Sequence, residues 1–262
     1  MDLILHILAG ATVGFAIGLT GVGGGSLMTP ILLLFQYPAP VAIGTDLLYA
    51  AITKSGGVIA HRRLGNIDWK IVAILASGSI PVSIFLNTLV LDKSFQQSEQ
   101  YEKLLTLSLG IMLMVTAIVL IFRQTLRIKA TTRPPIRFIA FIQKHRTVMT
   151  FVMGLILGAV VTLSSVGAGA FGAAVLLTLY ARMPAVHIIG TDLAHAVPLT
   201  LIAGLGYLYH DFVDFKLLGS LLIGSLPAIY LGTKVGANLP ETTMQRVLIS
   251  VLLIMGLKYT FF

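Results

Sequence analysis

A glycine run near the amino terminus has the composition expected of an anion-binding helix tip. It extends from Gly18 to Ser26 and is followed by a short apolar segment. Glycine within a membrane span interrupts the helix and frees backbone N–H groups, and the next helix adds a partial positive charge at its N-terminus. We therefore expect this run to bind an anion with neutral backbone donors. The candidate substrate-binding residues are Thr20, Gly21, Gly23, Gly24, Gly25 and Ser26.

A second, degenerate copy of this run follows in the other half of the chain. Its candidate substrate-binding residues are Ser164, Ser165, Gly167, Gly169 and Gly172. The glycine spacing matches a dinucleotide fingerprint by letter, but no βαβ unit surrounds it, and no lysine completes a P-loop in the first copy. Close helix packing is the alternative interpretation of both runs, and it is the one we favour for Gly10, Gly14 and Gly18 at four-residue spacing.

Ionisable residues inside apolar segments are a second set of functional candidates, because a charge at membrane depth costs free energy. Asp46 and Asp192 are either proton- or cation-coupling carboxylates or helix-terminal charges that anchor the adjacent glycine loops. Lys54 either binds the anion or extends towards the cytoplasm. His195 is either a proton carrier or a structural histidine.

Two prolines interrupt long apolar segments. Pro81 and Pro227 each follow a glycine-serine pair, and a proline inside a helix removes a backbone hydrogen bond and kinks it. Each kink is either a static packing feature or a hinge for a conformational change. The preceding serines, Ser79 and Ser225, are candidate hydroxyl donors to an anion.

The elements that must position these residues are membrane helices. Of the 262 residues, 56% are hydrophobic and 11% are charged, whereas a soluble domain has about 25% charged residues. This composition excludes a soluble domain and disorder, and the absence of cysteine excludes disulfides, thiolate metal sites and a cysteine nucleophile. Hydropathy predicts an all-α polytopic membrane protein with helical segments near 3–19, 26–37, 41–60, 70–91, 103–122, 147–163, 170–181, 184–208, 213–236 and 244–261. Segments 26–37 and 170–181 are too short to span a bilayer, so we interpret them as half-helices of re-entrant hairpins.

The two halves of the chain repeat one another in register. The run from Ile43 to Leu47 recurs from Ile189 to Leu193, and the Gly-Ser-x-Pro motifs fall at equivalent positions. Each half has an odd number of crossings, so the second half enters the membrane from the opposite side. We therefore expect a first transmembrane repeat over 1–122, a linker over 123–146 and an inverted second repeat over 147–262, as in many secondary transporters.

The positive charges predict the orientation. Segment 123–146 is rich in Lys and Arg and has no acidic residue, so the positive-inside rule makes it a cytoplasmic linker and places both termini outside. The N-terminus lacks a basic region, so we expect the first helix to be retained and not cleaved as a signal peptide. The net charge of +8 is then explained by the basic residues on the cytoplasmic side of the membrane, some of which can contact lipid head groups. We therefore expect no nucleic-acid partner.

The sequence resembles the TauE/SafE family over nearly the whole chain. The resemblance is carried by the first glycine run, its degenerate second copy, the Asn66–Trp69 loop and the motif around Pro81. The resemblance implies a protein of the bacterial inner membrane that exports sulfite, sulfoacetate or a related organosulfonate, with the substrate left open within that class.

The expected function is therefore a secondary transporter with a midplane site, and the alternative is a passive anion channel of the same architecture. An intramembrane enzyme is not supported, because the sequence contains no nucleophile motif. Asp46 and Asp192 could in principle approach one another as a dyad, which a structure would decide. The expected partners are a small anion, the lipid bilayer and, as a candidate coupling ion, the proton. We expect no metal or other cofactor, and nothing in the sequence indicates an oligomer.

Overall fold

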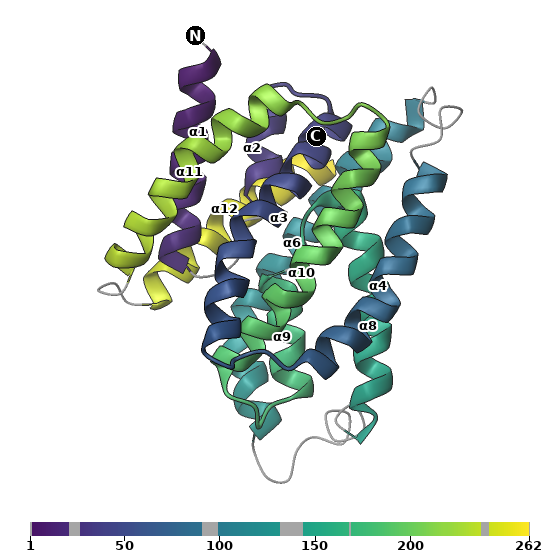
Figure 1. Cartoon of the computed structure of the whole chain (residues 1–262), viewed down its shortest axis with the longest axis vertical. Helices are drawn as coiled ribbons and strands as arrows, with labels where there is room; N and C mark the ends of the chain where they lie inside the picture. Colours follow the sequence, from purple (N-terminus) through teal and green to yellow (C-terminus); the bar gives the residue numbers. More distant parts are fainter. Residues whose placement is uncertain are drawn as a thin grey trace.

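The computed structural model describes residues 2–20, 27–90, 99–131, 144–167, 169–236 and 241–261. This part of the chain is all-helical and contains ten helices (Figure 1). They are α1 (Asp2–Thr20), α2 (Met28–Leu34), α3 (Ala39–Arg63), α4 (Trp69–Val90), α6 (Glu99–Thr131), α8 (Arg146–Ser164), α9 (Ala170–Leu179), α10 (Ala185–Tyr209), α11 (Phe215–Gly236) and α12 (Glu241–Phe261). Each of the ten expected helical segments is confirmed as a helix.

Two helix boundaries differ from the sequence expectation. The second helix is shorter than 26–37, because α2 ends at Leu34 and Gln36 follows with a φ of 62°. The fifth is longer than 103–122, because no glycine or proline interrupts the sequence after residue 122 before Pro134, and α6 continues to Thr131. The first part of the expected linker over 123–146 is therefore helical.

Aspartates begin two of the long helices in the same way. Asp68 Oδ1 accepts hydrogen bonds from the backbone N–H groups of Lys70 and Ile71, at 3.0 and 3.2 Å. Asp214 Oδ1 accepts equivalent bonds from Lys216 and Leu217, at 2.9 and 3.0 Å. These bonds satisfy N–H groups that have no partner in the first turns of α4 and α11.

The long helices pack in pairs that combine the two halves of the sequence. α1 lies along α11, α4 along α8, α3 against α10 and α6 against α12 (Figure 1). A Cβ atom on Gly10 or Gly14 of α1 would overlap the backbone of α11 at Leu221 or Ser225, and one on Gly18 would overlap it at Ile229. The packing interpretation of these three glycines is confirmed.

The α4–α8 contact repeats the α1–α11 contact. Gly154 and Gly158 of α8 lie against Leu75 and Ser79 of α4, which occupy the positions of Leu221 and Ser225 in the sequence repeat. The loops that precede α4 and α11 correspond as well. Thr191 Oγ1 accepts the N–H of Asp68 at 2.9 Å, and Thr45 Oγ1 accepts the N–H of Asp214 at 3.3 Å.

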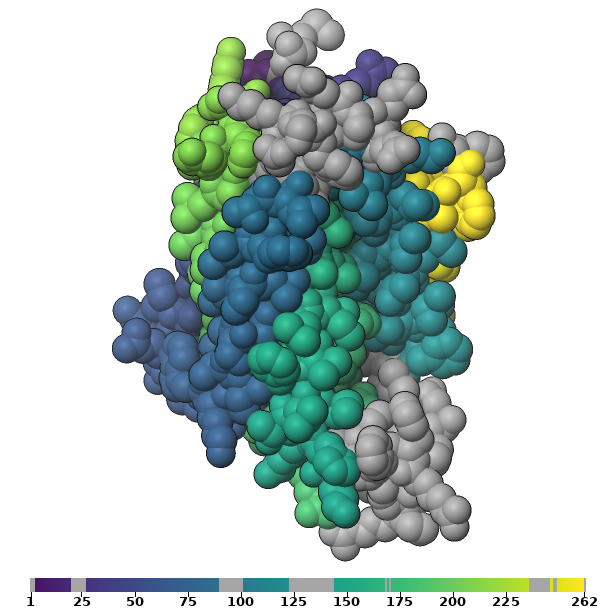
Figure 2. Space-filling view, turned by 90° about the vertical axis from the view of Figure 1, so that its right-hand side faces the viewer, coloured from purple at the N-terminus to yellow at the C-terminus, as the bar shows by residue number. Residues whose placement is uncertain are grey.

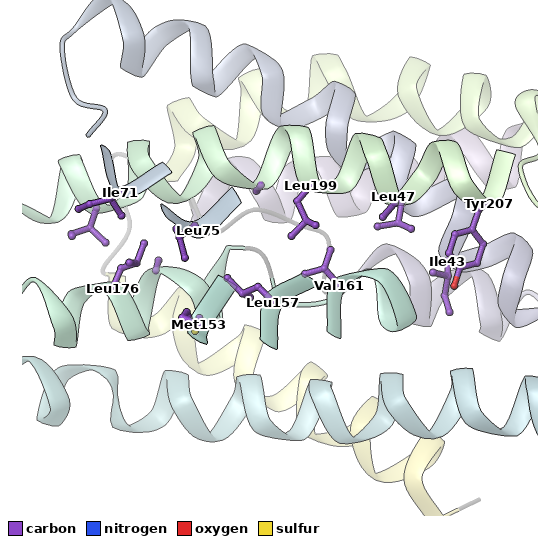
Figure 3. Packing of buried hydrophobic residues seen from close by; sticks show 14 of the residues in the cluster. Ile43, Leu47, Ile71, Leu75, Met153, Leu157, Val161, Leu176, Leu199 and Tyr207 are labelled. Carbon is purple, nitrogen blue, oxygen red and sulfur yellow. The ribbon is translucent and has the colours of Figure 1, made fainter. Parts of the chain in front are cut away.

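The largest buried cluster of apolar side chains lies where α3, α4, α8, α9 and α10 meet. Figure 3 shows Ile43, Leu47 and Tyr207 at one end of this core and Ile71 and Leu176 at the other. The surface is also apolar, and exposed apolar side chains include Phe85 of α4 and Ile156 of α8. Figure 2 shows the face on which α4 and α8 lie side by side. Helices α4, α6, α8, α10 and α11 each contain an apolar stretch long enough to cross a membrane. The chain is therefore a multi-pass membrane protein.

Candidate functional site

Four ionisable residues predicted from the sequence are buried on the paired helices α3 and α10. The exposed fractions are 0% for Asp46, 5% for Lys54, 2% for Asp192 and 0% for His195. Lys54 interacts electrostatically with both carboxylates and with His195, so it links the acids of the two halves. We call Asp46, Lys54, Asp192 and His195 the central cluster. The burial of Lys54 favours the interpretation in which it belongs to a binding site over the one in which it extends towards the cytoplasm.

Asp46 holds the start of the short helix α2. Its Oδ2 accepts the backbone N–H of Thr29 at 3.2 Å and also the Thr29 hydroxyl. A carboxylate at a helix N-terminus satisfies free N–H donors and interacts favourably with the helix dipole. The anchoring interpretation of Asp46 thus has a direct structural basis, and Thr29 is a partner that the sequence alone did not indicate.

The other oxygen of Asp46 faces the second half of the chain. Asp46 Oδ1 is buried without a hydrogen-bond partner among the described residues, as is the hydroxyl of Ser165. The Ser165 hydroxyl is close enough to interact with the Asp46 carboxylate. The end of α8 and the start of α2 therefore meet at Asp46.

The second glycine run forms a tight turn between α8 and α9. Ser164 has a local structural role, since its hydroxyl donates to Val160 O at 2.7 Å and accepts the N–H of Val166 at 3.2 Å. Gly167 and Gly169 have φ angles of 118° and 130°, which side chains other than glycine rarely adopt. The turn is thus specified by backbone conformation, and of its two serines Ser165 faces the central cluster.

The short helix α9 meets Asp192 as α2 meets Asp46. A Cβ atom on Gly172 would overlap Oδ1 of Asp192, so only glycine permits the carboxylate to lie against the first turn of α9. Asp192 Oδ1 has no hydrogen-bond partner within the described ranges. Each short helix therefore begins against a buried carboxylate from a long helix, and Lys54 interacts with both carboxylates.

His195 is held by a serine from another helix. Its Nε2 lies 2.8 Å from the Ser79 hydroxyl of α4, while its Nδ1 is buried without a partner in the described part of the chain. The sequence suggested Ser79 as a donor to an anion and did not predict this contact. Pro81 of α4 and Pro227 of α11 are exposed and do not belong to the central cluster, so their proposed role as hinges stays a prediction.

The first glycine run lies largely outside the described residues. Of its candidates, Gly21, Gly23, Gly24, Gly25 and Ser26 are not described, and Thr20 is described only as the last residue of α1. The structure thus brings together Asp46, Lys54, Asp192, His195, Ser165 and Gly172, and it leaves the role of 21–26 as a prediction. No group of three or more His, Cys, Asp or Glu side chains suited to a metal ion occurs among the residues described.

Comparison with known proteins gives the family. Residues 6–259 match the family described as Sulfite exporter TauE/SafE, and the chain belongs to that family. It is 36% identical over 253 residues to the probable membrane transporter protein YjnA of Bacillus subtilis, with 96% of this chain and 97% of that protein covered. It is 28% identical to the probable membrane transporter protein YdhB of the same organism and 30% identical to a probable membrane transporter protein of Xylella fastidiosa. No solved structure matches the chain.

Proposed function

We propose that this protein is a secondary transporter that exports a small sulfur-containing anion across the cytoplasmic membrane. The family description names sulfite, and the relatives are named as probable membrane transporters without a substrate. Sulfoacetate and related organosulfonates extend this class on the basis of the resemblance described above. The protein is proposed to act on its substrate by moving it, without a chemical reaction.

The observation that carries this proposal is the burial of Lys54 between carboxylates from the two halves. An ammonium group that is removed from water is costly unless opposite charges surround it, and such groups inside membrane proteins mark ion pathways. An anion next to Lys54 would interact with its charge and with the N-terminal ends of α2 and α9. The proposed site therefore consists of Lys54, Ser165, Gly172 and the glycine run 21–26.

We further propose that the two halves are inverted repeats that alternate the access of this site. The equivalent α1–α11 and α4–α8 contacts support this arrangement, because each joins one half to the other in the same register. In transporters built this way, the halves move against each other around a site at the membrane midplane. Pro81 and Pro227 interrupt α4 and α11, the helices that make these contacts, so they are suited to act as hinges.

The proposed orientation places segment 123–146 in the cytoplasm and both termini outside the inner membrane. With that orientation, a membrane potential that is negative inside favours outward movement of an anion by about 2.3 kcal/mol per net charge for 100 mV. Export then needs no nucleotide, and the protein is proposed to work with the anion, the bilayer and coupling protons alone.

The test is efflux of sulfite or sulfoacetate from proteoliposomes that contain the purified protein. We expect efflux to exceed that of empty liposomes and to be lost in Lys54→Met, which removes the buried charge and retains an unbranched side chain. Lys70→Met is the matched control, because Lys70 is exposed at the start of α4, and it should transport like the wild type. Efflux by Lys54→Met at the wild-type rate would remove Lys54 from the site, and absence of efflux for every sulfur anion would overturn the proposed substrate class.

A further inference from the structure

The charges of the central cluster do not balance. Asp46 and Asp192 carry two negative charges when ionised, Lys54 carries one positive charge and the neutral imidazole of His195 carries none, which leaves a net charge of −1. The undescribed run 21–26 adds no ionisable side chain, so the sum does not depend on its position. A bound anion would make the net charge −2 or more negative, and uncompensated charge in a buried site costs free energy. Uptake of one proton by a carboxylate would offset this added charge.

The two carboxylates differ in their capacity to accept that proton. Asp46 Oδ2 accepts two hydrogen bonds from Thr29, and these favour the ionised form of the group. Asp192 Oδ1 is buried against Gly172 of α9 and has no hydrogen-bond partner among the described residues. Lys54 supplies the opposite charge that acts on Asp192. A bound anion competes for Lys54, and Asp192 would then lose the stabilisation that this charge gives it.

The surroundings of Asp192 supply no other charge to compensate. Helices α3, α4, α8 and α9 pack against α10. Of their titratable groups, Lys54 of α3 acts on Asp192. Asp46 and Tyr49 lie earlier on α3, and its last turn contains His61, which lies next to Gly190, and the exposed Arg62 and Arg63. Lys70 of α4 and Arg146 of α8 are exposed, and α9 has no titratable group. On α10 itself the neighbouring titratable group is His195, one turn away and held by Ser79.

We propose that Asp192 takes up one proton when the anion binds, while Asp46 remains the ionised anchor of α2. This inference rests on the proposed transport function and adds its coupling ion. The proton enters from the water on the side from which the anion binds, converts the Asp192 carboxylate to the acid and leaves again when the anion is released. For a monoanion the net charge of the cluster is then unchanged by binding. A dianion carried with one proton still moves one net negative charge, so the membrane potential still drives its export.

The sign of the pH dependence follows from this uptake. A reaction that takes up one proton becomes less favourable as pH rises, so the dissociation constant for an anion of fixed charge should increase about tenfold per pH unit while Asp192 is ionised before binding. Asp192→Asn, which is always neutral, should bind the anion with an affinity that no longer depends on pH. A purely structural role of Asp192 would weaken binding without removing this slope.

Calorimetric titration with sulfoacetate tests the inference, because its charge is constant between about pH 6 and 8. Titration of the purified protein in buffers of different ionisation enthalpy counts the protons bound with each anion. We expect about one proton for the wild type and for Lys70→Met, a control at an exposed position outside the central cluster, and none for Asp192→Asn. Asp192→Glu retains an ionisable group and should restore the uptake if Asp192→Asn fails to fold.

The outcomes separate the two proposals. Anion binding without proton uptake in the wild type, or undiminished uptake in Asp192→Asn, would overturn the role of Asp192 and leave the transport function in place. Loss of uptake in Asp46→Asn with retention in Asp192→Asn would assign the proton to the other acid and also overturn the inference. Absence of binding by sulfite, sulfoacetate and other organosulfonates would overturn the proposed function itself.

Discussion

The Ser79 hydroxyl and Nε2 of His195 lie 2.8 Å apart and join α4 to α10 two residues before Pro81. The equivalent positions in the other half are Ser225 of α11 and Tyr49 of α3, which lie close together although the Tyr49 hydroxyl has no hydrogen-bond partner among the described residues. Each proline-containing helix therefore approaches one of the two central helices two residues before its proline. The two contacts differ in chemistry, since only the first contains a histidine and a hydrogen bond.

A double-mutant cycle should detect the Ser79–His195 link. Ser79→Ala and His195→Ala each leave a buried polar partner or a cavity, and each should lower the stability of the folded protein by about 1 kcal/mol or more. The double mutant should cost less than the sum of the two, because the second change removes a partner that has already been lost. Thermal unfolding in detergent measures this, and strictly additive effects would show that the contact contributes nothing.

The prolines should affect transport more than stability. Pro81→Ala and Pro227→Ala remove no buried contact, since both side chains are exposed, but they allow the helix to recover a backbone hydrogen bond. If the kinks are hinges, the flux should fall severalfold while thermal stability is unchanged or increased. Leu226→Ala, an exposed neighbour in α11, is the control and should transport normally. Wild-type flux in both proline variants would identify the kinks as static.

Gly172 should be intolerant of even a methyl group. Gly172→Ala would place Cβ on Asp192 Oδ1 and displace the carboxylate from α9, which should lower the flux by about tenfold or more without preventing membrane insertion. Gly219→Ala is the matched control, because a Cβ atom there meets no other atom within 4 Å. Efflux assays on the two variants in parallel, normalised to the amount of inserted protein, measure the difference. Equal flux would show that the position of Asp192 against α9 is unimportant.

The first glycine run can be tested although it lies outside the described residues. Gly24→Val would fill the proposed backbone donor site with a branched side chain and should abolish flux while leaving insertion intact. Flux and membrane yield are measured together, so that a folding defect is separated from a transport defect. Normal flux in this variant would remove the run from the site.

Much of the fold was predictable because it depends on local signals. Hydropathy placed all ten helices, and glycine and proline marked the two short helices and the equivalent positions of the halves. Gly10, Gly14 and Gly18 predicted a close helix contact from their spacing alone. The helix ends were less accurate, as at Thr131, because a polar stretch without glycine or proline gives no stop signal.

The contacts within the central cluster were not predictable from local signals. Lys54 meets Asp192 only because α3 packs against α10, and Ser79 meets His195 across 116 positions of sequence. The alignment of the two sequence repeats could have predicted part of this arrangement. It places Ser79 at the position equivalent to Ser225, and Tyr49 at the position equivalent to His195. Lys54 corresponds to Thr200 in the other half, so its role breaks the repeat and had no counterpart from which to infer it.

Counterflow tests the central claim, alternating access at a single anion site, most directly. Proteoliposomes loaded with unlabelled sulfoacetate or sulfite are diluted into a trace of the same labelled anion, and its uptake is followed. A carrier predicts uptake that is accelerated by the anion inside and that saturates with concentration. Uptake that is proportional to concentration and unaffected by the internal anion would instead identify a passive channel and contradict alternating access.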